Sequence, residues 1–447
     1  MLVCFKMCVK SALKKTLPGS VRAWLRCKQK ECHEKRMRKR ELYEIYAIQR
    51  GLDAKIRAMA KVKEGAIRVG FFVISSSSFQ YENLLRLMVK DPLFAVSIVV
   101  IPDTLRGDEN MRKTMVSAYE AFKIQYGTRV RLAHNGDYKF VDLSADFDVC
   151  FVTNPYDGMT HPLYRFENLA RSGVLVAYTN YSYGEGTANA VNFNHMRSLQ
   201  FLWRFYLDRE AELVRMQHYQ LVLHRFKRLS LVGSIKTDAF ANVKVDKGVN
   251  KTIIIAPHHS VRGNATPLSM GTFDQYADFF SRLPVMYPQV HWIFRPHPLL
   301  FWTMRSVGLW NDSDEEDYIS KITAYNNVSY VPEGDYHDFF VNSDALIQDS
   351  GSFIAEYHVV GHPQCYLLRD DTIERTQFND FGREMLAQTY KAYSEQDIID
   401  FIDNVVLAGN DPMKENRDKF AKEKLMYNYP HASEAIVADI KKALGRI

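Results

Sequence analysis

Short apolar segments that alternate with helix-like segments constrain the fold of this chain more than any other feature. The runs VGFFVI from Val69 and VSIVVI from Val96 are strand-like and too short to cross a bilayer of roughly 30 Å. A helical pattern over residues 111–126 follows them, and the alternation begins again near residue 251. Uniformly apolar strands between helices are typical of parallel sheets that are covered on both faces. The sequence therefore predicts two α/β units.

Composition and pattern divide the chain further. Residues 197–228 indicate one long helical stretch, and the polar and small residues that follow Ile235 indicate a linker. We expect the last, charged segment to brace both domains. The predicted segments are a basic helical extension (1–66), an N-terminal Rossmann-like acceptor domain (67–235), a linker (236–250), a Rossmann-like nucleotide-donor domain (251–408) and a C-terminal helical element (409–447).

The net charge of the chain, +6, conceals an asymmetry. Residues 1–66 contain 18 Lys or Arg and 6 Asp or Glu, a net charge of +12, so the remaining residues carry −6. A mildly acidic body argues against nucleic acid as a partner of the folded core, because nucleic-acid binding requires a basic surface.

The basic segment itself predicts a different partner. It contains the block KRMRKR over residues 35–40. Basic amphipathic segments with Trp and Leu bind anionic membrane surfaces, which we therefore expect as a partner. A solvated helix packed on the body, and a flexible tail, remain as alternatives. The apolar residues that could form the stripe are Leu13, Leu17, Val21, Trp24 and Leu25.

Cysteine spacing and the composition of the N-terminus indicate the cellular compartment. The six cysteines show neither zinc-like nor disulfide-framework spacing, which indicates reduced thiols. Lysines, among them Lys6 and Lys10, interrupt the apolar residues of the N-terminus, so a cytosolic chain without a signal peptide is expected. The sequence has no Walker-type loop and no carboxylate cluster that would oblige a metal, so we expect neither a metal nor a cofactor.

Asp349-Ser350-Gly351-Ser352 stands between an apolar strand and a helix that ends near Gly361. Small residues at such a junction leave backbone N–H groups exposed at a helix N-terminus, where N–H groups and serine hydroxyls hold phosphate. An ordinary N-cap is the alternative, because Ser and Asp cap helices in any protein.

Two histidine-containing loops follow other strands of the same half. Arg295-Pro296-His297-Pro298 stiffens the backbone around a histidine, whose side chain, with that of Arg295, can donate to phosphate oxygens. In Pro257-His258-His259-Ser260, adjacent histidines point in different directions, so we expect one of them to face a ligand. A metal site is disfavoured because neighbouring residues chelate poorly together. All three loops should meet at the carboxyl edge of one sheet and form an anion site suited to two phosphates.

The runs APHHS, FRPHPLL and VPEGDYHDFFVNSDALIQDSGSFIAEY, with GHPQCYLL after them, resemble the CDP-glycerol glycerophosphotransferase family of teichoic-acid-type polymerases and primases. The resemblance covers roughly Val149 to the C-terminus and is strongest over residues 252–385. It implies an α/β fold of GT-B type, in which two Rossmann-like domains face a central cleft and the second grips the diphosphate of a CDP-linked donor.

The resemblance also implies roles for individual residues. Arg295 and His297 would bind the donor phosphates together with Ser350, Gly351 and Ser352. Glu333 and Asp335 would lie beside the nucleoside, and His258 and His297 are catalytic candidates.

The N-terminal domain departs from the family pattern. Family polymerases carry Trp-His-Gly, whose histidine is the expected general base, where this chain has YSYG from Tyr181. His195 could supply the base instead, as could His161 or Glu185. Three further site candidates are His259, Tyr183 and Glu356.

The predicted activity is transfer of glycerol phosphate, or a related alditol phosphate, from CDP-glycerol or another CDP-linked donor. The acceptor would be a hydroxyl of a lipid-linked or cell-surface glycan precursor, CMP would leave, and the protein would lie peripherally on the inner face of the cell membrane. One alternative is a GT-B glycosyltransferase or epimerase that uses a nucleotide sugar. The other is a non-catalytic, membrane-associated nucleotide-binding protein.

Overall fold

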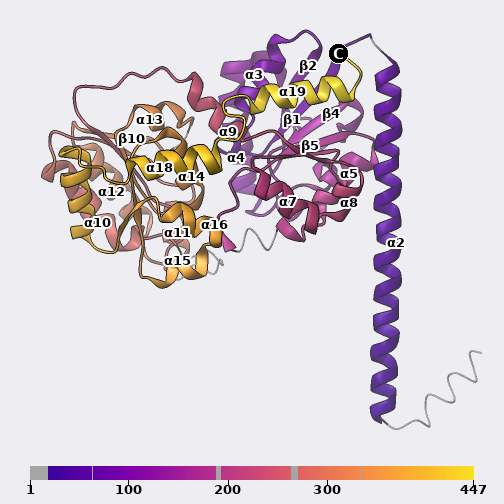
Figure 1. Ribbon diagram of the computed structural model, residues 1–447, viewed down its shortest axis with the longest axis horizontal. Coiled ribbons are helices and arrows are strands. Elements are labelled where there is room, and N and C mark those ends of the chain that lie inside the picture. The colour runs from indigo at the N-terminus through magenta and orange to yellow at the C-terminus, as the bar shows by residue number, and fades with distance from the viewer. Residues whose placement is uncertain (1–18, 63, 188–192, 263–269, 333, 447) are drawn as a thin grey trace, which may run out of the picture.

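The computed structural model describes residues 19–62, 64–187, 193–262, 270–332 and 334–446. Two α/β lobes lie side by side, and a long helix stands along the edge of the first (Figure 1). Each lobe is built on one parallel sheet with helices on its faces.

The sheet of the first lobe has seven strands in the order β3-β2-β1-β4-β5-β6-β7, all parallel. Its central strands are buried almost throughout, since their Val, Ile and Phe side chains meet helices on both faces. The strand order reverses between β1 and β4, which makes this a Rossmann-like sheet. The strands are β1 (Ile67–Val73), β2 (Phe94–Val100), β3 (Val130–Leu132), β4 (Val149–Val152), β5 (Leu175–Thr179), β6 (Arg204–Leu207) and β7 (Leu229–Leu231).

Amphipathic helices cover this sheet. In α3, for example, Leu84 and Leu85 face the core together with Met88, which lies about one turn further along, while Arg86 and Lys90 face solvent. The helices of the lobe are α3 (Glu82–Lys90), α4 (Asp108–Tyr126), α5 (Phe166–Arg171), α7 (Glu210–Tyr219), α8 (Leu221–Arg225) and α9 (Ile235–Asp238).

The second lobe repeats the topology with six parallel strands in the order β10-β9-β8-β11-β12-β13. The order reverses between β8 and β11, and ligands of open α/β sheets bind beside such a switch point. The strands are β8 (Thr252–Ala256), β9 (His291–Phe294), β10 (Val328–Tyr330), β11 (Ala345–Gln348), β12 (Gln364–Leu367) and β13 (Tyr390–Ala392).

Helices again pack on this sheet, and two of the later ones pass into π-helical turns at Phe401–Leu407 and Ala421–Leu425. The helices are α10 (Phe273–Met286), α11 (Leu300–Ser306), α12 (Asp312–Thr323), α13 (His337–Asn342), α14 (Gly351–Val360), α15 (Thr372–Gln377), α16 (Asp380–Leu386), α17 (Glu395–Asp400) and α18 (Lys414–Phe420).

The C-terminal segment returns to the first lobe. Phe420 and Leu425 pack with residues of the second lobe, whereas helix α19 (Ala432–Ala443) lies across α3 and buries Ile436 and Ile440 in the first (Figure 1). Asp439 of α19 also accepts a hydrogen bond from Arg204 Nε at 2.8 Å. The segment therefore spans both domains.

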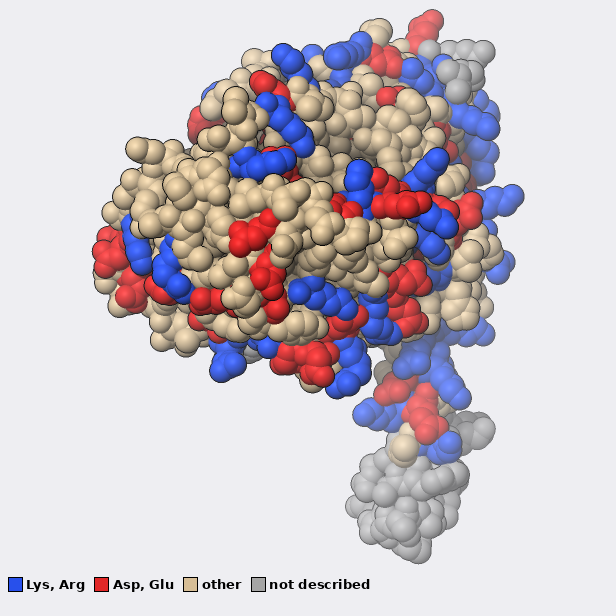
Figure 2. Space-filling view, turned by 60° about the vertical axis from the view of Figure 1, so that its left-hand side comes forward, with Lys and Arg blue, Asp and Glu red and all other residues tan. Residues whose placement is uncertain are grey.

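The C-terminal half of helix α2 (Gly19–Lys61) provides the described contacts of this helix with the first lobe. Ile45 and Leu52 are buried there, and Arg228 reaches Asp53 with 2.6 Å between Nη2 and Oδ1. The other half projects beyond the body (Figure 1) and carries Lys and Arg side chains among fewer acidic ones (Figure 2).

The predicted apolar stripe falls outside this description. Leu13 and Leu17 precede the described residues, and the side chains of Val21, Trp24 and Leu25 are not among those described. No helix of the described residues has the length and the apolar composition needed to cross a membrane.

One predicted element is wrong. Residues 197–228 do not form a single helix, because strand β6 interrupts them and pairs with both β5 and β7. Pairing on two sides buries Phe205, Tyr206 and Leu207, which favours the strand over local helix propensity.

The predicted linker is also more ordered at its start than its polar composition suggests. Ile235–Asp238 is helix α9, and Thr237 and Asp238 are buried.

Candidate functional site

Three loops leave neighbouring strands of the second sheet at the same edge. Residues 257–260 follow β8, residues 295–298 follow β9 and residues 349–352 follow β11. These strands are adjacent in the order β9-β8-β11 and flank the switch point. The loops therefore meet where a ligand of this sheet is expected to bind.

Three histidines from two of the loops form a cluster. The ring centroids of His258 and His259 are 4.3 Å apart, and those of His259 and His297 are 4.4 Å apart. One ring nitrogen of each of the three lies within 4.8 Å of the others. The structure thus brings both members of the adjacent pair, rather than one, against His297.

Backbone hydrogen bonds determine which ring nitrogens carry the protons. His258 Nδ1 accepts from the backbone N–H of Ser260 at 3.2 Å, and His297 Nδ1 accepts from that of Leu299 at 3.1 Å. In a neutral imidazole the other nitrogen, Nε2, then bears the hydrogen and is a donor. Metal-binding histidines have the opposite arrangement, with the distal nitrogen donating to an acceptor. This donor set fits an oxyanion rather than a cation.

The imidazoles of the cluster are held neutral. Burial, with the neighbouring His259 and Arg106, lowers the pKa of His297 to about 3, and burial with Arg106 lowers that of His259 to about 4. The pKa of His258 also lies well below its usual value, because the ring is buried beside the other two. At neutral pH the cluster therefore offers N–H donors without charge.

The start of α14 provides the third part of the site. Ser350 occupies the N-cap position with extended backbone, yet its side chain makes no capping hydrogen bond. Its Oγ lies 3.4 Å from Oγ of Ser352 instead. The serines are therefore not used as an ordinary cap, and the arrangement leaves them for a ligand at the helix N-terminus.

Asp349 ties the loops together. Its carboxylate is fully buried and accepts from the backbone N–H of His258 at 2.6 Å. It also accepts from the N–H of Thr272 at 2.6 Å and from Thr272 Oγ1 at 2.8 Å. Burial raises the pKa of Asp349 to about 6 despite these donors. The sequence motif pointed to this segment, but nothing in the sequence identified Thr272 as the partner.

Arg295 serves mainly to hold a neighbouring turn. Its Nη2 donates to Gly334 O at 2.6 Å, and its guanidinium lies 5.5 Å from the centre of the Tyr336 ring. Asp335, in the same turn, is exposed and pairs with His337. Glu333 lies outside the described residues. The predicted contacts of these three residues with phosphate and nucleoside stay predictions.

The first domain reaches the same site through the loop after β5. Tyr183 Oη donates to Leu425 O at 3.2 Å, and the backbone N–H of Asn379 donates to Glu185 O at 3.0 Å. Glu185 lies against Gly351, since a Cβ at that glycine would stand 2.8 Å from Glu185 Oε1. Both sequence candidates in this loop therefore lie at the interface between the two domains.

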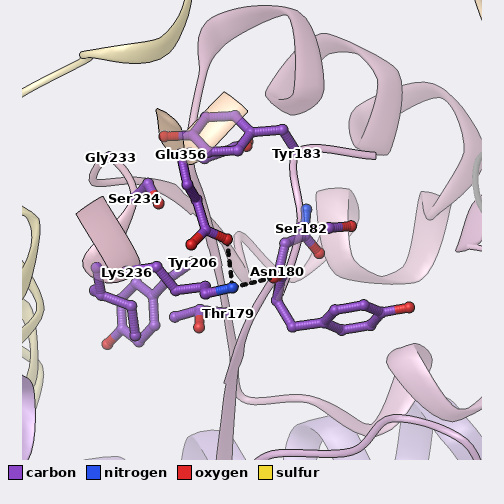
Figure 3. A pocket seen from close by; sticks show the side chains of 12 residues that line it. Thr179, Asn180, Ser182, Tyr183, Tyr206, Gly233, Ser234, Lys236 and Glu356 are labelled. Carbon is purple, nitrogen blue, oxygen red and sulfur yellow. Dashed lines mark hydrogen bonds and ion pairs between the residues drawn. The ribbon is translucent and has the colours of Figure 1, made fainter. Parts of the chain in front are cut away.

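A small pocket adjoins this interface (Figure 3). In it, Lys236 Nζ lies 2.5 Å from Glu356 Oε1 and 3.1 Å from Tyr181 O. Tyr336 donates to the other oxygen of Glu356. The candidate Glu356 is thus held in an ion pair that joins α9 to α14. The remaining lining includes Thr179, Asn180, Ser182, Tyr183, Tyr206, Asp208 and Ser234.

Two predicted bases lie elsewhere. His195 is exposed and packs edge-on against Tyr219, with 5.3 Å between ring centroids. His161 packs on Phe140 and Tyr164. No contact found among the described residues links either histidine to the three loops.

Arg106 is a site residue that sequence reasoning missed. It belongs to the loop after β2, is ion-paired with Asp103, and acts electrostatically on His259 and His297 across the domains. A cation from the first domain therefore faces the histidine cluster of the second. No motif surrounds it, so the sequence gives no signal for this role.

No protein-family model and no curated protein sequence matches the chain. Solved structures do match its fold. The wall teichoic acid polymerase TagF superposes with a TM-score of 0.58 at 12% identity, covering 92% of this chain and 98% of that one. A TagF variant soaked with CDPG gives 0.54 at 13% identity, with the same coverages of 92% and 98%.

A UDP-GlcNAc 2-epimerase from Neisseria meningitidis, bound to UDP-GlcNAc, gives a TM-score of 0.50 at 13% identity. The match covers 85% of this chain and 100% of the epimerase. Together with the two parallel sheets, these similarities confirm the predicted fold: the chain is a GT-B-like α/β protein with two Rossmann-like domains.

Replacement of Asp349 by Ala should destabilise the protein by about 3–5 kcal/mol, because three buried donors lose their acceptor. The midpoint of chemical denaturation measures the change. Asp317→Ala, on the exposed face of α12, is the matched control and should shift stability by less than about 0.5 kcal/mol. Equal midpoints for the two variants would contradict the role of Asp349.

Proposed function

We propose that the protein transfers glycerol phosphate, or a related alditol phosphate, from a CDP-linked donor to a hydroxyl of a lipid-linked or cell-surface glycan acceptor, releasing CMP. The observation that carries this proposal is the convergence of neutral imidazole donors and the α14 start beside the switch point of the second sheet. The fold similarity to TagF favours a CDP-linked donor among nucleotide donors.

The hydrogen-bond donors of the site suit a diphosphate. His258 and His297 offer Nε2–H groups, and the start of α14 offers backbone N–H groups at the positive end of its dipole. The two imidazoles can bind one phosphate, and the N–H groups of α14 can bind the other. Arg106 stands opposite and adds positive potential from the first domain.

In the proposed reaction the acceptor hydroxyl enters from the first domain and attacks the phosphorus that bears glycerol. The bond from this phosphorus to the oxygen of CMP breaks, and CMP leaves with the electron pair. Negative charge that develops on the transferring group is stabilised by His297 and the α14 start, in keeping with phosphoryl transfer as a reaction governed by positioning and electrostatics.

A second candidate is a glycosyltransferase or epimerase that uses a nucleotide sugar. The fold similarity to the UDP-GlcNAc 2-epimerase favours it, and the same diphosphate clamp would serve. The two functions differ in the atom that is attacked, which is phosphorus in the first and carbon in the second.

The projecting half of α2 suggests where the reaction takes place. Its exposed basic residues include Arg36, Arg38, Lys39 and Arg40. We propose that this basic segment holds the protein on the anionic inner face of the cell membrane, where a lipid-linked acceptor is located.

Donor identity can be tested directly. We expect incubation of the protein with membrane extract and CDP-glycerol to release CMP, whereas UDP-GlcNAc and CMP-sugars release no nucleotide. The products are separated by anion-exchange chromatography. Conversion of UDP-GlcNAc without turnover of any CDP-linked donor would support the epimerase instead.

His297→Ala should lower the rate of transfer by roughly 10²–10³-fold, because one donor to the developing charge is lost. His224→Ala, which removes an exposed histidine of α8, is the control and should leave the rate unchanged. Initial rates of CMP release measure both. Equal rates for both variants would show that His297 does not contribute to the reaction.

Membrane attachment is tested by co-sedimentation of the full chain with vesicles. We expect binding to phosphatidylcholine vesicles that contain phosphatidylglycerol, and weaker binding at high salt. Replacing Arg36, Arg38, Lys39 and Arg40 by Glu should lower the affinity by more than roughly 10²-fold, at about 1 kcal/mol for each basic residue lost. The same change at Lys414, Lys419, Lys422 and Lys424, which are exposed on the second lobe, should have little effect.

A further inference from the structure

The Glu185 side chain is buried at the meeting point of the two domains. The residue is 3% exposed and belongs to the loop that follows β5. The loop is fixed to the second domain on both sides of Glu185, since Asn379 Nδ2 donates to Gly184 O at 2.7 Å and Gly186 forms a β-bridge with Phe378. The position of Glu185 is therefore imposed by the domain contact.

Its carboxylate lies against the start of α14. Oε1 lies so close to Gly351 that a Cβ there would stand 2.8 Å away. A side chain at position 351 would force the Glu185 carboxylate to shift, so the glycine permits this approach. Gly351 is flanked by Ser350 and Ser352, whose hydroxyl oxygens lie 3.4 Å apart at the same helix start.

One oxygen of this buried carboxylate has no partner. Glu185 Oε2 makes no hydrogen bond with any group in the part of the chain that the structure describes. A buried carboxylate oxygen left without a donor is costly, and such groups in native proteins are concentrated at functional sites. A hydroxyl that enters beside Oε2 would therefore supply the hydrogen-bond partner that this oxygen lacks.

The surroundings favour the uncharged carboxyl only in part. Burial raises the pKa of Glu185, and the negative charge of Glu356 adds to this, whereas Arg209 and Lys236 lower it. Tyr181 and Tyr366 also face the group. A carboxyl whose pKa is raised above its usual value is a stronger base once it is ionised, which general base catalysis requires.

Resting on the proposed function, we propose that Glu185 is the general base that takes the proton from the acceptor hydroxyl, from its place against Gly351 at the start of α14. It reaches this place from the loop after β5, in the domain from which the proposed acceptor enters.

The acceptor O–H bond breaks and its proton passes to Glu185 Oε2, while the acceptor oxygen forms a bond to the phosphorus. The phosphorus–oxygen bond to CMP breaks, and CMP keeps the electron pair. The proton is released from Glu185 to solvent when the products leave, so no other reactant is needed.

The experiment compares Glu185→Gln and Glu185→Asp with wild type and with Glu384→Gln, which removes an exposed glutamate of α16. We expect Glu185→Gln to lower kcat for CMP release by roughly 10²–10⁴-fold, and Glu185→Asp to retain part of the activity. The wild-type rate should rise with pH through the raised pKa of Glu185 and then level off. The Gln variant should lack that rise, and Glu384→Gln should behave as wild type.

Affinity for CDP, measured by calorimetry on the same proteins, makes the test independent of turnover. Removing the carboxylate should strengthen CDP binding at pH values above the pKa of Glu185, since an ionised Glu185 repels the diphosphate, and should leave CDP binding unchanged below that pKa. A Gln variant that releases CMP at the wild-type rate would overturn the assignment of the base and leave the proposed function standing.

Wild-type protein that turns over no CDP-linked donor would overturn the proposed function. In that case the pH dependence of CDP binding alone tests whether Glu185 lies beside the phosphates. If wild type and Glu185→Gln then show the same dependence of CDP affinity on pH, Glu185 does not lie beside the phosphates and the inference is overturned as well. Melting temperatures of all variants confirm that they are folded.

Discussion

The Asp349 carboxylate, buried at the end of β11, accepts hydrogen bonds from the His258 backbone and from Thr272. These contacts hold the loop after β8 against the start of α14, and Tyr366 fixes the same residue by donating to its carbonyl at 3.0 Å. The imidazoles and the helix N-terminus can face one ligand only while that geometry is kept. Because the Asp349 carboxylate is fully buried and accepts three hydrogen bonds, the arrangement is held firmly, which suits catalysis by positioned dipoles.

The second constraint is the interface between the domains. It is polar where it approaches the site. Lys236 is ion-paired with Glu356, and one oxygen of the buried Glu185 carboxylate has no partner among the described residues. A purely structural interface would place apolar groups at such positions, since buried charges are expensive. The α19 helix, which returns to the first lobe, holds the two domains together while this polar region remains available for chemistry.

Much of the fold was predictable because parallel strands buried on both faces are apolar throughout, and the small-polar loops after them mark their carboxyl ends. Strands such as β1, β8 and β11 follow this rule. The helical interpretation of residues 197–228 failed because β6 is only Arg204–Leu207 and its pairing with β5 and β7 is not local. Arg106 was missed for a similar reason, since its proximity to His259 depends on how two domains meet.

Local sequence determined the two-domain α/β architecture and the loops that carry histidine and serine, because periodicity and turn residues act over a few positions. Tertiary structure alone decided that His258 and His259 both meet His297, that backbone N–H groups place the imidazole protons on Nε2, and that Glu185 lies against Gly351. These are contacts between segments far apart in the chain. Their geometry depends on strand order and domain packing, which no single stretch of sequence contains.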